Sequence, residues 1–135
     1  MAFVFDSSAV LTYLLEEPEA DQVEGALDEA RAGRERLLLP FMTLMEVRYR
    51  LLRDYPSEAA LAMALVNSWP AQVFESTPEW RGQAARIKAS GGLSMGDAWI
   101  AALALMHDAT LIHKDKEFDR VAGLRSLHLG RTRAK

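Results

Sequence analysis

The chain has no cysteine, which excludes disulfide bonds, thiolate metal ligands and cysteine nucleophiles. Its three histidines, His107, His113 and His128, show no metal-ligand spacing, and we expect surface or packing roles for them. The longest unbroken apolar run, 98–106, is too short to cross a membrane. Asp6 interrupts the first apolar run and no basic segment precedes it, so we expect no secretory signal. These absences predict a cytoplasmic protein with no membrane partner.

What is present predicts one globular domain over residues 1–135, because this length can bury a substantial core. Hydrophobic residues make up 50% of the chain and charged residues 26%, which is typical of globular proteins. The net charge of -3 argues against a nucleic acid held by electrostatics alone. If four carboxylates bind metal, however, the remaining acids are balanced by the 16 Lys and Arg. Net charge therefore leaves a nucleic-acid partner open.

Short apolar runs alternate with helical periodicity along the chain. We expect strands at 2–5, 37–39, 72–74 and 110–112, with 126–129 as an edge strand. We expect helices that end near Leu15, Gly33, Leu52, Trp69, Ala89 and Met106, and a short helical turn through Phe118 and Val121. This alternation predicts a parallel sheet with helices on both faces, which is a three-layer α/β/α domain. The core should include Leu51, Leu61, Leu65 and Trp69.

Four acidic residues recur at one kind of position in this pattern. Asp6 directly follows the first strand, and Asp115 follows the fourth. Glu46 lies in the first turn of the helix after the second strand, and Asp97 in the first turn of the buried helix. The carboxyl ends of parallel strands and the beginnings of the following helices share one edge of a sheet. We therefore expect these four carboxylates to meet at that edge.

Helix capping is the competing interpretation. Thr43 with Glu46, and Ser94 with Asp97, both have capping-box spacing, and Asp6 can cap the first helix by itself. Asp97 is harder to explain as a cap alone, because it opens a nearly all-apolar helix where an unpaired charge is costly. A divalent cation would be a suitable partner, and oxygen ligands without His or Cys favour Mg²⁺ or Mn²⁺.

Taken together, these motifs resemble the PIN-domain ribonucleases, and their order and spacing are most similar to the small bacterial toxins of VapC type. The segments that carry the resemblance are Val4-Phe5-Asp6-Ser7-Ser8, Thr43-x-x-Glu46-Val47, Leu93-Ser94-Met95-Gly96-Asp97-Ala98 and Asp115-x-x-Phe118. The resemblance covers essentially the whole chain. It implies a PIN-like domain with a central parallel sheet of about five strands, and Mg²⁺ or Mn²⁺ held by Asp6, Glu46, Asp97 and Asp115. It also implies hydrolysis of RNA phosphodiester bonds.

The resemblance further implies a toxin–antitoxin pair, in which the third to fifth helices supply a homodimer face and a groove for the antitoxin. Some of the four residues expected in the core would then lie at that interface instead. Ser7 and Ser94 match family positions beside the site, where they would orient ligands. His113 departs from the pattern, because these toxins more often carry Thr or Ser there. Lys114 and Lys116 flank the fourth acid; they would contact RNA phosphates or form a solvated charge cluster.

Asp115 and Asp119 both compete for the fourth acidic position. Asp119 lies one helical turn beyond Asp115, about 5.4 Å along a helix axis. Because Mg²⁺–oxygen bonds are about 2.1 Å long, we expect Asp115 to lie next to the cation. We expect Asp119 either to support the metal ligands without touching the cation itself, or to pair with a neighbouring Arg or Lys on the surface.

Two other enzyme or signalling classes also begin with a strand and an aspartate. A haloacid dehalogenase-like phosphohydrolase needs a second acid two residues after the first, where this chain has Ser8. A receiver-like Mg²⁺-binding module needs paired acids after its first strand and an aspartate after its middle strand. Here Asp6 stands alone, and Pro40 and Phe41 follow the second strand. A catalytically inactive PIN-like interaction module remains the principal alternative.

Overall fold

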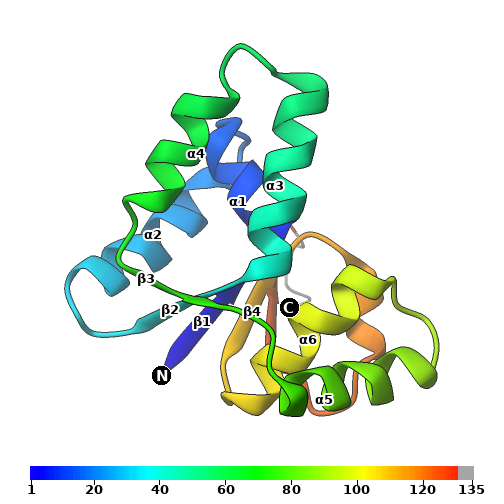
Figure 1. Cartoon of the computed structure of the whole chain (residues 1–135). Coiled ribbons are helices and arrows are strands. Elements are labelled where there is room, and N and C mark those ends of the chain that lie inside the picture. Colours follow the sequence, from blue (N-terminus) through cyan, green and yellow to red (C-terminus); the bar gives the residue numbers. More distant parts are fainter. Residues whose placement is uncertain (131–135) are drawn as a thin grey trace.

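The computed structural model describes residues 1–130 and contains a five-stranded parallel sheet (Figure 1). The strands are β1 (Ala2–Phe5), β2 (Arg36–Pro40), β3 (Ala71–Phe74), β4 (Thr110–His113) and β5 (Ser126–His128). Their order across the sheet is β3-β2-β1-β4-β5, and all four neighbouring pairs are parallel. The predicted parallel sheet and its edge strand at β5 are confirmed. The last five residues, 131–135, in which we expect a basic and frayed tail, lie outside the described residues.

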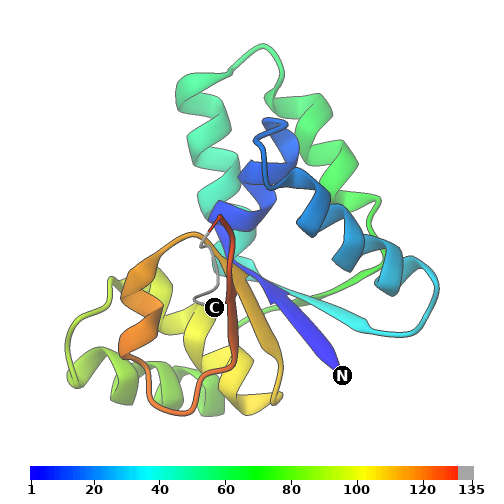
Figure 2. The same ribbon diagram turned by 180° about the vertical axis from the view of Figure 1, so that it is seen from behind.

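Helices cover both faces of the sheet, as the sequence predicts. They are α1 (Ser7–Leu14), α2 (Ala20–Arg31), α3 (Phe41–Asp54), α4 (Ala59–Asn67), α5 (Pro78–Ala89), α6 (Met95–Met106) and a short 3₁₀ helix, η1 (Lys116–Arg120). Figures 1 and 2 show α1–α4 on one side of the sheet and α5 and α6 on the other. The three-layer α/β/α architecture is therefore confirmed.

The two cores follow from the alternation of side chains along the strands. In β2, Leu37 and Leu39 pack with α1–α4, whereas Leu38 between them packs with α5 and α6. Leu51 and Trp69 are buried as predicted. The prediction for two leucines of α4 is wrong, because Leu61 and Leu65 are 78% and 43% exposed. Helix α4 is short and apolar all round, and its inward face is taken by Ala59, Met63 and Val66.

Helix α3 begins earlier than the capping-box spacing predicts. Its N-cap is Pro40, and no side chain caps it. The Thr43 hydroxyl instead donates a hydrogen bond to the Phe5 carbonyl, at 2.7 Å. Thr43 therefore fastens the first turn of α3 to the end of β1 and is not paired with Glu46 as a cap. This contact brings the beginning of α3 to the edge of the sheet where β1 ends.

Helix α6 is largely buried, as its apolar sequence predicts. Ala98 and residues 100–104 are all buried. Helix α5 covers it, and the Trp80 indole Nε1 donates to the Trp99 carbonyl at 2.8 Å. Among residues 1–130, no helix combines the length and the apolar character that crossing a membrane requires.

Candidate metal centre

A pocket of about 580 Å³ opens at the edge of the sheet where β1 and β4 end. Five acidic side chains from separate parts of the chain line it: Asp6, Glu46, Asp97, Asp115 and Glu117. The first four are the acids that the sequence predicts will meet, and the structure brings all four to this pocket. Glu117 was not predicted. The parallel topology explains the convergence, because strand ends and helix beginnings share this edge.

Asp6 is 3% exposed and has one carboxylate oxygen with a partner and one without. Its Oδ2 accepts hydrogen bonds from the Ser8 backbone N–H, at 3.2 Å, and from the Ser8 hydroxyl. Its Oδ1 is buried and lacks a hydrogen-bond partner among the described residues. The Ser8 hydroxyl also accepts from the Lys114 N–H, at 2.9 Å, which ties the beginning of α1 to the segment after β4. Asp6 therefore caps α1 with one oxygen and leaves the other available to a ligand.

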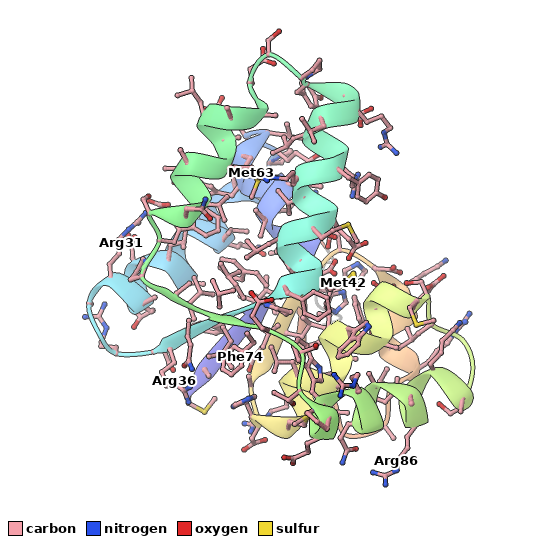
Figure 3. All side chains as sticks on the ribbon, in the orientation of Figure 1. Arg31, Arg36, Met42, Met63, Phe74 and Arg86 are labelled. Carbon is pink, nitrogen blue, oxygen red and sulfur yellow. The ribbon has the colours of Figure 1, made fainter. Side chains whose placement is uncertain are left out.

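Glu46 and Asp97 face each other across α3 and α6. The Ser94 hydroxyl caps α6 and accepts from the Asp97 N–H, at 3.2 Å, as the spacing predicts. A Cβ atom at Gly96 would lie 3.1 Å from Glu46 Oε1 and 3.4 Å from Met42 Cγ. Figure 3 labels Met42 at the base of α3, beside α6. Glycine thus permits the close approach of the two helices, and Glu46 Oε1 is buried without a partner among residues 1–130.

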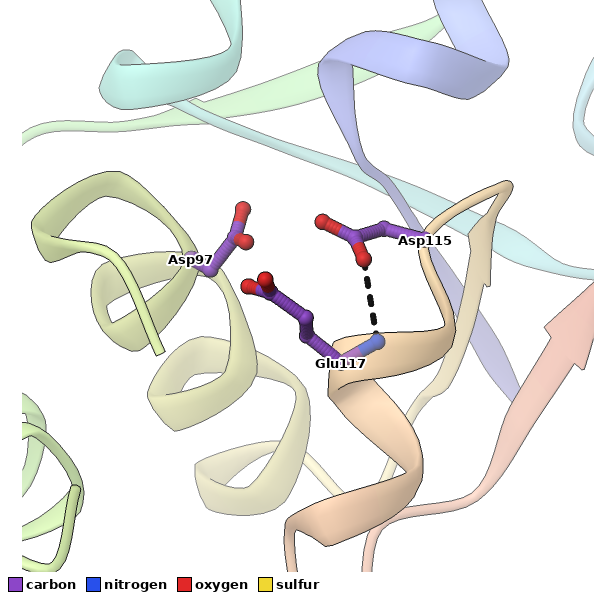
Figure 4. Close-up of side chains that lie close together, drawn as sticks. All are labelled: Asp97, Asp115 and Glu117. Atoms are coloured by element: carbon purple, nitrogen blue, oxygen red, sulfur yellow. Dashed lines mark hydrogen bonds between the residues drawn. The ribbon is translucent and has the colours of Figure 1, made fainter. Parts of the chain in front are cut away.

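Asp97, Asp115 and Glu117 form the tightest group, with one oxygen from each lying within 4.8 Å of the others (Figure 4). Asp115 Oδ1 accepts from the Glu117 N–H, at 2.9 Å, and this bond caps η1. The sequence signal for Glu117 was the Asp-x-Glu spacing directly after a strand. Asp119 is exposed and is not among the residues that line the pocket. Its negative charge acts instead on the ring of His113.

Burial and mutual repulsion raise the pKa values of three of these acids, Asp6, Glu46 and Asp97. Burial, followed by the charge of Asp6, raises the pKa of Glu46 to about 7, against an opposing effect of Arg50. Burial also raises the pKa of Asp97 to about 7, with Asp6 and Asp115 adding to the rise. The pKa of Asp6 is raised, mainly by burial. The cluster therefore lacks enough positive charge of its own to keep all its carboxylates ionised.

Hydroxyl and cationic side chains complete the lining. Ser7 and Ser94, predicted beside the site, both line the pocket, as do Arg50, Lys114 and Lys116. The Lys114 ammonium group is already paired with Glu17, at 3.0 Å, and with Glu19. Sequence analysis missed Arg50, whose signal was its position four residues after Glu46 on the same helix.

His113 is a packing residue that supports the backbone of Asp115. It is fully buried, and its Nδ1 accepts from the Asp115 N–H, at 3.1 Å. Its ring stacks on His128, with centroids 5.1 Å apart and an interplanar angle of 11°. Burial, followed by the charge of His128, lowers the pKa of His113 to about 4. The neutral ring replaces a hydroxyl group at this departure from the VapC pattern.

Residues 3–124, which include all five acids, match the PIN domain family. The chain belongs to the PIN domain family. Solved structures with the same fold include VapBC2 from Rickettsia felis bound to a promoter DNA fragment. That alignment has 14% identity and a TM-score of 0.78, and covers 96% of this chain and 99% of the other. No curated protein matches this chain in sequence.

Two further structural neighbours have the same fold as this PIN domain. A toxin–antitoxin complex from Klebsiella pneumoniae aligns with 21% identity and a TM-score of 0.67, covering 90% of this chain and 93% of the other. Mycobacterium tuberculosis VapC20, a toxin that cleaves the sarcin–ricin loop, aligns with 20% identity and a TM-score of 0.68 over 92% and 96% of the two chains. At these identities the likeness establishes the fold.

The acidic cluster of this PIN domain fits a divalent metal ion. Two buried carboxylate oxygens, Asp6 Oδ1 and Glu46 Oε1, lack partners among the described residues. The oxygens of Asp97, Asp115 and Glu117 are close enough to share one ligand. A donor set of carboxylates and hydroxyls, with no thiolate, suits Mg²⁺ or Mn²⁺.

Proposed function

We propose that this PIN domain is a Mg²⁺- or Mn²⁺-dependent endoribonuclease that acts as the toxin of a toxin–antitoxin pair. One observation supports it above all: five acids converge in an open pocket, and two of their buried oxygens lack a partner. Burying carboxylates this way lowers stability unless a cation compensates them. The acidic cluster lies at the carboxyl edge of a parallel sheet, which is the edge where α/β proteins bind ligands.

Asp97, Asp115 and Glu117 would hold the cation together with the unpaired oxygen of Asp6, and Glu46 would lie at its margin. A bound divalent cation supplies an activated water and stabilises charge on phosphate oxygens. Within the chain, Ser8 fixes the orientation of Asp6, and Ser94 fixes the first turn of α6 that carries Asp97. Glu46, with a pKa raised to about 7, is suited to accept a proton at Oε1 from the attacking water.

An exposed apolar strip supports the proposed protein partners. Met45, Tyr49 and Leu52 are 50%, 45% and 56% exposed, and they recur along one side of α3. Leu61 of α4 adds a further exposed leucine. Exposed apolar surface of this kind favours contact with another protein. We assign these helices to the homodimer face and the antitoxin groove.

The first test is RNA cleavage by purified protein with Mg²⁺ or Mn²⁺. We expect cleavage that chelator abolishes and that Asp97→Asn reduces by more than about 100-fold, the usual upper range for residues that only support a metal site. Asp119→Asn is the matched control, because it also removes one carboxylate but lies outside the pocket lining. Cleavage that persists in chelator, or that Asp97→Asn leaves intact, contradicts the proposal.

Growth is the second test, because a toxin acts inside the cell that makes it. Expression of the wild-type chain alone should arrest bacterial growth, whereas Asp6→Asn and Asp97→Asn should be harmless although folded. Equal toxicity of all three chains would contradict the assignment of the acidic cluster.

A further inference from the structure

The acidic pocket creates a difficulty for an RNA ligand, because RNA carries a negative charge at every phosphate. Five carboxylates line the pocket, against three cationic side chains: Arg50, Lys114 and Lys116. A metal ion would compensate the acids at the centre, but the phosphates on either side of the reacting one need partners of their own. The question is which of the three cations are available.

Lys114 is not available. Its ammonium group pairs with Glu17 at 3.0 Å and with Glu19, and only 27% of its side chain is exposed. Its backbone N–H is held by the Ser8 hydroxyl. Lys114 is thus committed to joining the segment after β4 to the α1–α2 connection, and a phosphate would have to displace two carboxylates to reach it.

Arg50 is available. It lies on α3 four residues after Glu46, which places the two side chains on the same side of the helix with about 6 Å between their Cβ atoms. Within residues 1–130 the guanidinium makes no hydrogen bond or ion pair, although its charge lowers the pKa values of Glu46 and Glu17. By contrast, Arg53 on the same helix is bound to Asp54 through two hydrogen bonds of 2.9 Å.

Lys116 is available from the other wall of the pocket. It is the first residue of η1, is exposed, and makes no ion pair within residues 1–130. Figure 4 shows η1 below the acids and the beginning of α3 above them. Arg50 and Lys116 therefore line the same pocket from two different elements, α3 and η1.

We propose that Arg50 and Lys116 bind the RNA phosphates that flank the acidic pocket, an inference that rests on the proposed function. A guanidinium donates two parallel hydrogen bonds to phosphate oxygens, and an ammonium group binds them as a point charge. The RNA strand then crosses the pocket between α3 and η1, with the reacting phosphate over the carboxylates. Contacts to phosphates position a strand without selecting its sequence.

The salt dependence of RNA binding tests this assignment. Fluorescence anisotropy of a labelled single-stranded RNA with 2′-O-methyl riboses, which resists cleavage, is measured at one saturating Mg²⁺ concentration, so that the acids stay compensated and a changed metal affinity has no effect. Each phosphate contact contributes about 0.7 to the slope of log Kd against log salt for single strands. Arg50→Ala and Lys116→Ala should each lower that slope by about 0.7 and weaken binding at low salt by about tenfold. Arg50→Lys, which keeps the charge, should retain the slope.

Arg53→Ala is the matched control, since it removes an arginine of the same helix that is already paired. It should leave the slope unchanged, and thermal melting checks that every variant is folded. Slopes for Arg50→Ala and Lys116→Ala equal to that of Arg53→Ala would overturn the inference, even if the wild type cleaves RNA. Lowered slopes in a chain that fails to cleave RNA with Mg²⁺ or Mn²⁺ would support the phosphate contacts and contradict the proposed function.

Discussion

Two groups of acidic residues lie beside one another in this molecule, and pKa values within the two groups are shifted in opposite directions. Glu17 and Glu19 share the ammonium group of Lys114, and the hydrogen bond from Lys114 lowers the pKa of Glu17. In the adjacent pocket, burial raises the pKa values of Glu46 and Asp97 to about 7. The first group is compensated by the chain itself, and the second is not.

Whether the chain supplies a cationic partner distinguishes acids that stabilise the fold from acids that are available to bind a ligand. The compensated group links α1–α2 to the segment after β4, because Lys114 lies far from both glutamates in sequence. In the uncompensated group, the hydrogen bonds that Asp6 accepts and the charge of Arg50 near Glu46 do not offset burial. The pKa values of Asp6, Glu46 and Asp97 therefore stay raised. Such sites are retained for function more readily than for stability.

The largest effects are expected when the acids of η1 and the residue before it are removed one at a time. Asp115→Asn and Glu117→Gln should each weaken Mn²⁺ binding, Asp115→Asn by more than about 100-fold and Glu117→Gln by about 10- to 100-fold. Asp119→Asn should have the smallest effect, because it does not line the pocket. Calorimetric titration with Mn²⁺ measures all three. A larger loss for Asp119→Asn than for the other two would contradict the assignment.

The two groups should also respond to pH in opposite directions. An acid whose folded pKa is raised loses stabilisation as pH rises from its unfolded pKa, about 4, towards its folded value. For Glu46 and Asp97, with values of about 7, the metal-free protein should lose about 2 kcal/mol between pH 4.5 and 7.5, a figure reduced for solvent screening in the open pocket. Urea unfolding with chelator measures this change. Asp97→Asn should flatten the dependence, and added Mg²⁺ should offset it at high pH.

Removing the ammonium group of Lys114 should leave Glu17 and Glu19 uncompensated, as the acids of the pocket are. Lys114→Met keeps the apolar stem and leaves Glu17 and Glu19 without their cation, so it should lower the free energy of unfolding at pH 7 by about 1 kcal/mol. Because the folded pKa of Glu17 is lowered, this stabilisation is present above its unfolded pKa and is lost as pH falls. Wild type and Lys114→Met should therefore approach each other as pH falls below about 4.5 and converge only below the folded pKa of Glu17. Equal stability at pH 7 would show that the pair contributes nothing.

The smallest expected effect comes from a substitution at the close approach of α3 and α6. A methyl group at Gly96 would press on Glu46 Oε1, the end of a movable side chain, so Gly96→Ala should displace the carboxylate with little loss of stability. We expect Mn²⁺ binding to weaken by about tenfold. Gly82→Ala on α5 meets open space and is the control; it should raise stability by about 0.5 to 1 kcal/mol without changing Mn²⁺ binding. Identical Mn²⁺ affinities for the two variants would contradict the close contact.

The sequence predicted the sheet and the meeting of four acids because both follow from local patterns and one topological rule. Asp6, Glu46, Asp97 and Asp115 each occupy a strand end or a first helical turn, and parallel strands bring such positions together. The strand order β3-β2-β1-β4-β5 was not predicted, because strand pairing between distant segments leaves no trace in periodicity. The role of Lys114 was missed for the same reason.

The errors come from places where local patterns were ambiguous. Thr43 has the spacing of a cap, but Pro40 already begins the helix, which leaves the hydroxyl free to bind Phe5. Leu61 and Leu65 lie on a helix that is apolar all round, so its sequence does not indicate which side faces inward. Glu117 was passed over because the segment after Asp115 was read with α-helical spacing, whereas η1 is a 3₁₀ helix.

The central claim is that the uncompensated acids hold a divalent cation. Anomalous diffraction from crystals soaked in Mn²⁺ tests this most directly, because it locates the ion without relying on activity. The account predicts a manganese peak in the pocket, within bonding distance of carboxylate oxygens from Asp97, Asp115 and Glu117 and beside Asp6, and no such peak in crystals of Asp97→Asn. Manganese found only outside this pocket, or none at a concentration that supports RNA cleavage, would contradict it.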